Sequence, residues 1–289
     1  MDNDKHYQLL SQKLSKRGHQ FLPLLRCPVT GSSLEDHHTH FQTPDGSHIY
    51  QFEAGILRLL TPEQKRAFAA EELSISTENQ SNDWQSPTPD DFRQLPQTGL
   101  DGWPLGYWQR RAEITAEMWR VIEHIRVDEE RLPIGPMGNA VDFTDDMGWI
   151  AYGLDMSGYT TIAVSQSIGS YGLGVFDHSR YLRVQAAIDN PPLTPEQFDL
   201  VVFSFSLKTP QPTLDHAVRL LKKGGLLIVM ADKGNESIQQ EAGTALQSLG
   251  FEARFQRVGA MGNTFSRTLK NLVGYRPDVP PLVVVRRQR

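Results

Sequence analysis

The stretch from Asn139 to Ser165 constrains the fold most, because it has the pattern of a complete strand–loop–helix–strand unit. Residues 140–143 form a short apolar run that holds one acid, and residues 149–156 place apolar side chains at helical spacing. Gly158 ends the helix, and residues 160–164 form the β-branched, apolar run expected of a buried parallel strand. A unit of this kind predicts the first half of a nucleotide-binding α/β sheet.

The C-terminal half continues the alternation of strands and helices. We expect further strands over 181–187, 198–205 and 226–230, and helices over 214–221 and 236–249. Two final strands, 251–258 and 282–286, are expected to pair antiparallel. The result is an α/β protein with a doubly wound, Rossmann-like sheet.

The 289 residues divide by composition into three parts. Residues 1–60 are expected to form a small β module, because short β-like runs (39–42, 48–52 and 56–60) alternate with Gly, Pro, Ser and Asp. Residues 61–104 are expected to form a helix from Thr61 to about Leu73 and then a polar linker or lid. Residues 105–289 are expected to form the α/β domain, which begins with an amphipathic helix over 105–125.

Charge and cysteine content exclude several classes of protein. The net charge of −5 argues against nucleic-acid binding by bulk electrostatics. No apolar run reaches membrane-spanning length, and the first residues do not resemble a secretion signal. Cys27 is the single cysteine, so no disulfide can form within the chain. We therefore expect a cytoplasmic protein that does not associate with a membrane.

Two segments carry a resemblance to a known family. Residues 198–202 (FDLVV), followed by a helix and by residues 220–228 (LLKKGGLLI), resemble the fourth and fifth strands of class I S-adenosylmethionine (SAM)-dependent methyltransferases. The family has an L-x-P-G-G turn here, and Lys223 stands at the proline position. The resemblance covers roughly residues 105–260. It implies a seven-stranded sheet with a reversed final hairpin, SAM as cofactor, and a leading helix over the cofactor pocket.

The resemblance also implies which residues bind the cofactor, and several depart from the family pattern. The family loop D-x-G-x-G-x-G corresponds to residues 142–148, in which only the last glycine remains. The acid expected after the second strand is replaced by Ser165, and Ala187 stands where an acid caps the third strand. The expected cleft opens between Phe143 and Gly148. The implied cofactor residues are Asp142, Thr144, Asp146, Gly148, Ser165, Gln166, Ala187 and Ser204.

Three further residues are candidates for catalysis. Asp232 ends the fifth strand and is the carboxylate best placed for substrate contact. His178 lies on the loop before the third strand and is a candidate general base. Lys208 follows the fourth strand, where open α/β sheets place reacting groups, and it would act as a base if burial lowered its pKa.

The N-terminal module resembles the short zinc ribbons found beside some methyltransferases, through residues 24–31 (LLRCPVTG) and the later residues Gly46 and Tyr50. Thr30 occupies the position of the second cysteine, and Cys27 alone cannot hold a tetrahedral zinc. One alternative is a substitute site that joins Cys27 to four histidines; the other is a solvated hairpin edge without metal, which we expect. The four histidines are His37, His38, His40 and His48.

Two functions remain open at this stage. The first is a SAM-dependent methyltransferase that acts on a small molecule, with catalysis mostly by positioning. The second is a catalytically inactive methyltransferase-like protein that serves as a binding or assembly partner of another protein. The second is motivated by the joint departures at the cofactor loop and at the ribbon cysteines.

Overall fold

The structure is a computed structural model of the chain. It describes residues 19–37, 39–53, 55–81, 122, 137–144, 148–166, 180–204, 210–230, 236–248, 253–256 and 282–286.

Seven strands of the C-terminal half form the main sheet. In the sheet they follow the order β7-β6-β5-β8-β9-β11-β10, so the order changes direction between β5 and β8. The first five in sequence are parallel, and β11 is antiparallel to both β9 and β10. This confirms the doubly wound sheet with a reversed final hairpin. The predicted count of seven holds for the C-terminal half alone, because four strands of the N-terminal module extend the same sheet. The bounds are Asn139–Phe143 (β5), Thr160–Ser165 (β6), Leu182–Gln185 (β7), Phe198–Phe203 (β8), Leu221–Met230 (β9), Ala253–Gln256 (β10) and Leu282–Arg286 (β11).

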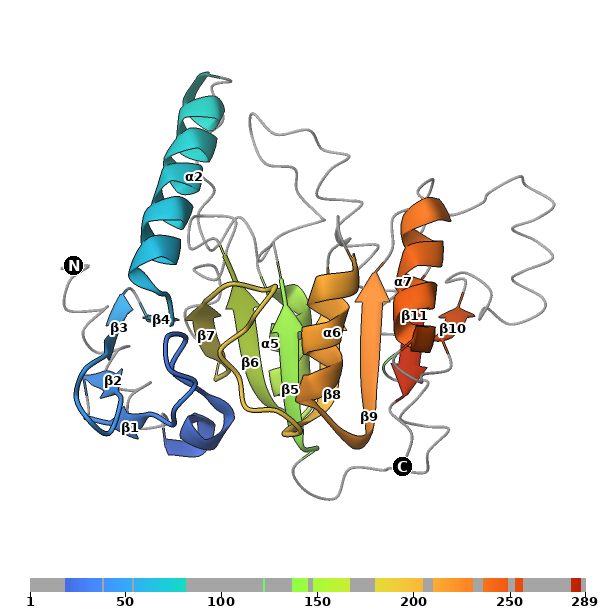
Figure 1. Ribbon diagram of the computed structural model, residues 1–289, viewed down its shortest axis with the longest axis horizontal. Helices are drawn as coiled ribbons and strands as arrows, with labels where there is room; N and C mark the ends of the chain where they lie inside the picture. The colour runs from blue at the N-terminus through green and yellow to red at the C-terminus, as the bar shows by residue number, and fades with distance from the viewer. Residues whose placement is uncertain are drawn as a thin grey trace.

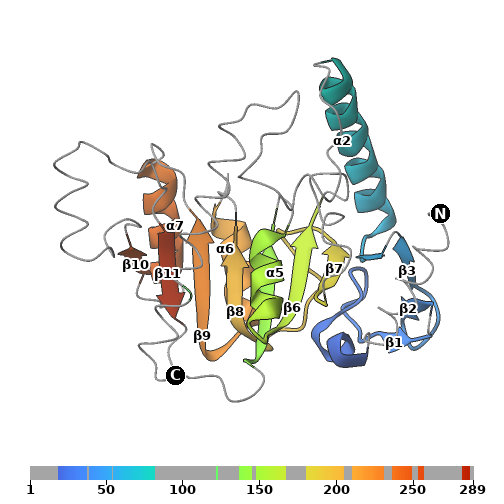
Figure 2. The same cartoon turned by 180° about the vertical axis from the view of Figure 1, so that it is seen from behind.

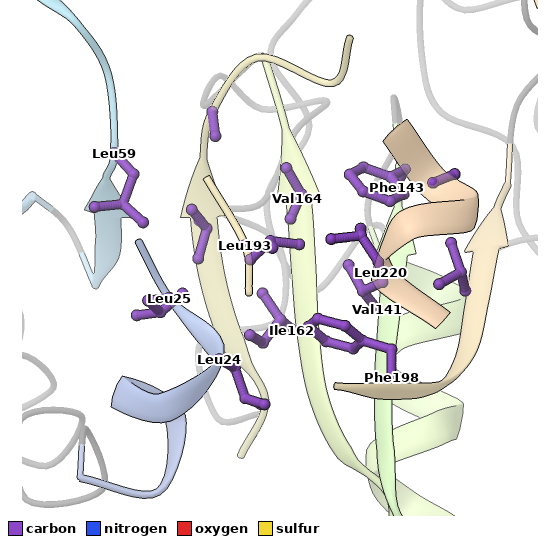
Figure 3. Close-up of a cluster of buried hydrophobic side chains, with 14 of the residues drawn as sticks. Leu24, Leu25, Leu59, Val141, Phe143, Ile162, Val164, Leu193, Phe198 and Leu220 are labelled. Atoms are coloured by element: carbon purple, nitrogen blue, oxygen red, sulfur yellow. The ribbon is translucent and has the colours of Figure 1, made fainter. Parts of the chain in front are cut away.

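Helices cover both faces of the main sheet. Helix α6 (Pro210–Leu220) lies in front of the sheet in Figure 1, and α5 (Trp149–Met156) lies in front in the reverse view of Figure 2. Helix α7 (Glu236–Ser248) packs against α6. Because side chains alternate along a strand, Val141 and Phe143 enter the main apolar cluster with α6 (Figure 3), whereas Asp142 points toward α5, where its carboxylate accepts a bond from the Ala151 N–H.

The N-terminal module continues the main sheet. Its strands are Glu35–Asp36 (β1), His40–Gln42 (β2), Ile49–Glu53 (β3) and Ile56–Arg58 (β4), and β4 pairs parallel with β7 to give an eleven-stranded sheet. A second connection follows the short helix η1 (Leu22–Leu24), where Leu25 forms a bridge with Leu193. Leu24 and Leu25 lie in the same buried cluster as Ile162 and Val164 (Figure 3). The division into domains stays a prediction, to which the structure adds one shared sheet and one shared core.

Helix α2 (Pro62–Ser81) begins as the sequence predicts and extends further. The Thr61 hydroxyl accepts a hydrogen bond from the Gln64 N–H at 3.2 Å, and the Gln64 side-chain oxygen accepts one from the Thr61 N–H at 3.0 Å. This reciprocal pair is a capping box, with Pro62 at the first helical position. The helix continues eight residues beyond Leu73, so the first part of the predicted linker is helical. In Figure 1 it projects above the edge of the sheet next to β7.

Strand β9 begins earlier than predicted. A strand was expected from residue 226, but β9 starts at Leu221, directly after α6 ends at Leu220. Gly224 has a φ of 79°, and a Cβ on Gly225 would lie 3.0 Å from the carbonyl oxygen of Phe198. The two glycines therefore allow the chain to turn inside the strand while it stays close to β8.

Two further expectations concern a leading helix and membrane-spanning segments. The helix predicted over 105–125 lies outside them apart from Ile122, which is helical and buried. None of the helices in the described part of the chain has the length and apolar content needed to cross a bilayer.

Candidate functional site

A row of buried polar side chains follows the carboxyl edge of the main sheet. Asp142 is in register with Ala163 on β6 and with Val202 on β8, and Ala163 is in register with Arg183 on β7. The residues two positions further along each of these strands lie on the same face of the sheet. They form a row beside the point where the strand order changes direction. Its members are Ser204 from β8, Thr144 from β5, Ser165 from β6 and Gln185 from β7, each at most 4% exposed. We call these four residues the polar row.

Hydrogen bonds hold the polar row in place. The Ser204 hydroxyl and N–H both donate to the Phe143 carbonyl, at 3.2 and 3.0 Å. The Thr144 N–H donates to the Val164 carbonyl at 2.9 Å, and the Gln185 side-chain amide donates to the Gln166 carbonyl at 2.8 Å. Neighbouring strand ends are therefore tied to one another at the edge where open α/β sheets bind ligands.

Asp142 caps the N-terminus of the helix that follows it, α5. Its carboxylate is fully buried and accepts a hydrogen bond from the Ala151 N–H, in the first turn of α5, at 3.0 Å. The N-cap residue of that helix, Gly148, has no side chain to cap it. A carboxylate at a helix N-terminus also interacts favourably with the helix dipole. One oxygen of the predicted cofactor residue Asp142 is thus engaged by the fold, and its contact with a cofactor stays a prediction.

Gly148 is the one glycine of the family loop that this sequence retains. Its φ of 76° is left-handed, and a Cβ at this position would lie 3.1 Å from the Tyr181 hydroxyl oxygen. Both observations favour glycine, because other residues adopt this conformation at a cost and Tyr181 occupies the space. The bend from β5 into α5 therefore depends on Gly148.

Arg183 is a charged residue of this face that the sequence analysis did not single out. Its side chain is 1% exposed and lies one layer beneath the polar row, two strands away from Asp142 with Ala163 between them. Burial of a charge is costly without compensation. The face under the polar row thus contains one buried cation and one buried carboxylate.

The remaining predicted cofactor residues lie at the ends of β6 and β7. Gln166 is half-buried, and its carbonyl accepts the Gln185 bond described above. Ala187 is buried in a small apolar cluster with Leu60 and Phe68. Gln185 was missed by the sequence analysis, although it is the second polar residue of an alternating strand (Leu182-Arg183-Val184-Gln185) whose carboxyl end meets the site.

The predicted catalytic residues cannot be placed. Asp232, His178 and Lys208 lie outside the described residues, as does Asp146 of the cofactor loop. Their roles stay predictions, and so does a cleft at the bend, since residues 145–147 are also outside.

The described part of the chain also contains an open cavity of about 310 Å³. It lies where β6 begins and α5 ends, at the opposite edge of the sheet from the polar row. Ligands of open α/β sheets bind outside the carboxyl ends, so this position does not fit a cofactor. The cavity is lined by Gln20, Phe21, Asp155, Gly158, Tyr159, Thr160, Thr161 and Arg180.

In the N-terminal module, hydrogen bonds engage the cysteine. The Cys27 sulfur lies 3.0 Å from the Tyr50 hydroxyl oxygen, and it accepts a bond from the Thr30 N–H at 3.4 Å. Burial acts to raise the pKa of the Cys27 thiol, but hydrogen bonds from Thr30 and Tyr50 outweigh it, and the pKa is lowered. Burial and the bond to Cys27 raise the pKa of Tyr50. The Cys27–Tyr50 bond thus links two buried groups, either of which can be the donor.

The histidines and the turn from Thr43 to Ser47 also form local contacts in the module. The rings of His37 and His40 stack at 5.3 Å, and His37 lies 3.7 Å from a carboxylate oxygen of Glu35. The Thr43 hydroxyl donates to Asp45, and bonds from Thr43 and then Ser47 lower the pKa of Asp45 to about 2. Among the residues that the structure describes, no group of three or more metal-binding side chains comes together, and the zinc-ribbon resemblance is not confirmed.

Comparison with protein families supports the central part of this description. Residues 134–229 match a family model described as a methyltransferase domain. The match begins just before β5, ends within β9 and includes the polar row. It confirms the resemblance to class I SAM-dependent methyltransferases over this segment. A search of curated proteins gave no match to the sequence.

Solved structures with similar folds are distant in sequence. A carbon methyltransferase, CurJ, is 14% identical with a TM-score of 0.41, and the match covers 55% of this chain but only 51% of CurJ. A SAM-dependent methyltransferase from Mesorhizobium loti is 14% identical with a TM-score of 0.43, over 59% of this chain and 98% of its own. A chain from a complex of the Haloferax volcanii Trm112 methyltransferase activator with a putative methyltransferase is 15% identical with a TM-score of 0.44. The match covers 62% of this chain and 93% of that one.

Proposed function

We propose that this protein is a SAM-dependent methyltransferase that acts on a small molecule. The observation that carries the proposal is the polar row, which lies at the carboxyl edge of the sheet beside the change of strand order. An edge that served only the core would be expected to hold apolar side chains, because burying polar groups is costly. The family match over the same strands supports the same conclusion.

The donor set fits SAM if neutral groups replace the usual charged ones. Ribose hydroxyls both donate and accept hydrogen bonds, and the hydroxyl of Ser165 and the side-chain amide of Gln166 can do the same. Thr144 and Gly148, at the two ends of the bend, would hold the amino-acid end, and Ala187 the adenine end. Neutral hydrogen bonds contribute about 0.5–1.5 kcal/mol each, against about 1.5–3 kcal/mol for bonds to a charged group. We therefore expect weaker cofactor binding than a carboxylate at position 165 would give.

Catalysis would depend on placement of the acceptor. SAM supplies a methyl group on a sulfonium, which is already activated for transfer. The task of the chain is then to hold the acceptor in line above the ends of β8 and β9, with Ser204 at the end of β8. His178 or Asp232 would take the proton that the acceptor atom loses, and Lys208 would line the same edge. These three assignments remain part of the proposal.

Cofactor binding gives the direct test. Titration calorimetry should detect binding of S-adenosylhomocysteine to the wild-type chain, and saturating ligand should raise its melting temperature. Ser165→Ala removes one neutral bond and should weaken binding about 2- to 10-fold. Ser165→Asp introduces a charged acceptor for the ribose and should tighten binding about 10-fold or more.

The matched control is Ser74→Asp, which places the same charge on the exposed surface of α2 and should leave the affinity unchanged. The proposal fails if neither the wild-type chain nor Ser165→Asp shows a thermal shift with millimolar SAM or S-adenosylhomocysteine. The inactive partner protein would then be the better description.

A further inference from the structure

The open cavity at the C-terminal end of α5 is separate from the polar row. Its volume of about 310 Å³ lies at the lower end of the range for small-molecule sites, about 300–1,000 Å³. Helix α5 has eight residues and is therefore about 12 Å long; it begins at the Gly148 bend and ends at the cavity. A ligand in the cavity would thus be small, and it would lie at the far end of this helix from a cofactor.

Asp155 brings a carboxylate to the cavity from the last turn of α5. The residue is half-buried, and its carboxylate accepts a hydrogen bond from the Arg180 N–H at 3.0 Å. A helix C-terminus carries partial negative charge, so an acid there is unfavourable by about 0.3–1 kcal/mol. The last turn of α5 contains no basic residue that would offset it. A carboxylate has about four acceptor sites, so it can bind a ligand ammonium group in addition to the Arg180 N–H.

Arg180 brings the opposite charge to the same cavity. Its side chain is exposed, and within the described part of the chain it forms no ion pair. The bond from its N–H to Asp155 places the cation and the carboxylate next to each other. A guanidinium binds a carboxylate through two parallel hydrogen bonds, so Arg180 suits the carboxylate of a ligand.

The other side chains around the cavity are mainly polar. Gln20 is exposed and Thr160 is half-buried, and both can donate and accept hydrogen bonds. The Thr161 hydroxyl donates to the Tyr159 carbonyl at 3.3 Å and is used within the chain. Phe21 is 1% exposed, so its ring offers little apolar surface. These observations describe a small, polar ligand that carries both charges.

We propose that this cavity is a second binding site, and that it takes a free α-amino acid with its ammonium group at Asp155 and its carboxylate at Arg180. The two charges of an amino acid lie on neighbouring atoms, as do the two charged side chains at the cavity. A simple cation or anion would satisfy only one of them. The inference does not depend on the proposed function, because the cavity lies at the opposite edge of the sheet from the polar row.

Analogues of the ligand test the two charges without altering the protein. A thermal-shift screen of the common amino acids, each at about 10 mM, should raise the melting temperature with at least one of them. Calorimetry then compares that amino acid with its amide, which lacks the carboxylate, and with its deaminated form, which lacks the ammonium group. Each analogue should bind about 10-fold or more weakly, since each loses a charge-assisted hydrogen bond.

Two variants assign the charges to residues. Asp155→Asn keeps an acceptor for the Arg180 N–H but loses the charge, and it should weaken binding about 10-fold. Arg180→Gln should weaken binding about 3- to 10-fold, a smaller range because solvent screens an exposed charge. The matched controls are Glu71→Gln and Arg66→Gln, which remove the same charges from the exposed surface of α2 and should leave the affinity unchanged.

The outcomes separate this inference from the proposed function. No thermal shift with any amino acid would overturn it, and so would binding that is equally tight to both analogues or that both variants leave unchanged. The analogue series uses the wild-type chain, so the test stays decisive if a variant does not fold. S-adenosylhomocysteine binding is measured independently, and its presence or absence does not bear on the cavity.

Discussion

Cys27 shows how a residue typical of a metal site can take another role. In a zinc ribbon its sulfur would be one of four ligands, but here it shares a hydrogen bond with the Tyr50 hydroxyl and accepts one from the Thr30 N–H. Both side chains are buried, at 1% and 5% exposure, so each satisfies a polar group that water does not reach. The contact joins the first turn of the module to strand β3, as shared zinc ligands would.

We expect the Cys27–Tyr50 bond to stabilise the fold in a coupled way. Cys27→Ala leaves the buried Tyr50 hydroxyl without this hydrogen-bond partner and should cost about 1–3 kcal/mol in the free energy of unfolding. In the double variant with Tyr50→Phe no such hydroxyl remains, so the total loss should be about 1 kcal/mol smaller than the sum of the single losses. Denaturant unfolding of all four proteins measures this coupling. Strictly additive losses would show that the two groups do not interact.

The element that depends most on one residue is the unit from β5 through the bend to α5. Gly148 provides the left-handed backbone, and Asp142 provides the cap that Gly148 lacks. A substitution here therefore has two separable costs, one from the backbone conformation and one from the space that Tyr181 fills.

Two glycine variants separate these costs. Gly46 also has a left-handed φ, 69°, but nothing lies within 4 Å of a Cβ built on it. Gly46→Ala should lower the free energy of unfolding by about 1 kcal/mol, because only the backbone conformation becomes unfavourable. Gly148→Ala should lower the free energy of unfolding by about 1 kcal/mol more than Gly46→Ala. Its Cβ would lie too close to the Tyr181 hydroxyl, so neighbouring core residues would have to shift. Thermal unfolding compares the two, and equal losses would show that Tyr181 moves aside at no cost.

For single helices and strands, the sequence predicted correctly those features that depend on residues close together in the chain. Alternation and helical spacing identified β5, α5 and β6, and the Thr61–Gln64 box marked the start of α2. Strand ends identified Ser165 and Ser204 in the polar row. The pattern misplaced the start of β9 at residue 226, because the two lysines and two glycines of 222–225 have no strand pattern and the close approach of Gly225 to the Phe198 carbonyl is a contact between distant residues.

Over the whole molecule, the least predictable feature was the attachment of the N-terminal module. Leu57 and Val184 are paired in the sheet, yet 127 residues separate them in sequence. Such a pairing leaves no periodic signal near either residue, and the same holds for the contact of Phe68 with Ala187. A separate module was therefore the natural expectation, whereas the structure shows a shared sheet and a shared core.

The shared core predicts that module and main sheet unfold together. Phe21, Leu24 and Leu25 belong to the same buried cluster as the central strands, so loss of one part exposes apolar surface of the other. The single cysteine allows a local measurement, because Cys27 is 1% exposed and becomes reactive only when the module opens. Thiol labelling of Cys27 and far-ultraviolet circular dichroism should give the same denaturant midpoint.

Thr194→Val tests the connection itself. The Thr194 hydroxyl donates to the Pro23 carbonyl at 2.7 Å, and its loss should cost about 1 kcal/mol. In a cooperative molecule that cost lowers the midpoints of both probes equally, because the bond stabilises one folded state. In the wild-type chain or in Thr194→Val, the Cys27 thiol could instead react at a denaturant concentration below the midpoint measured by circular dichroism. That result would show that the module opens by itself.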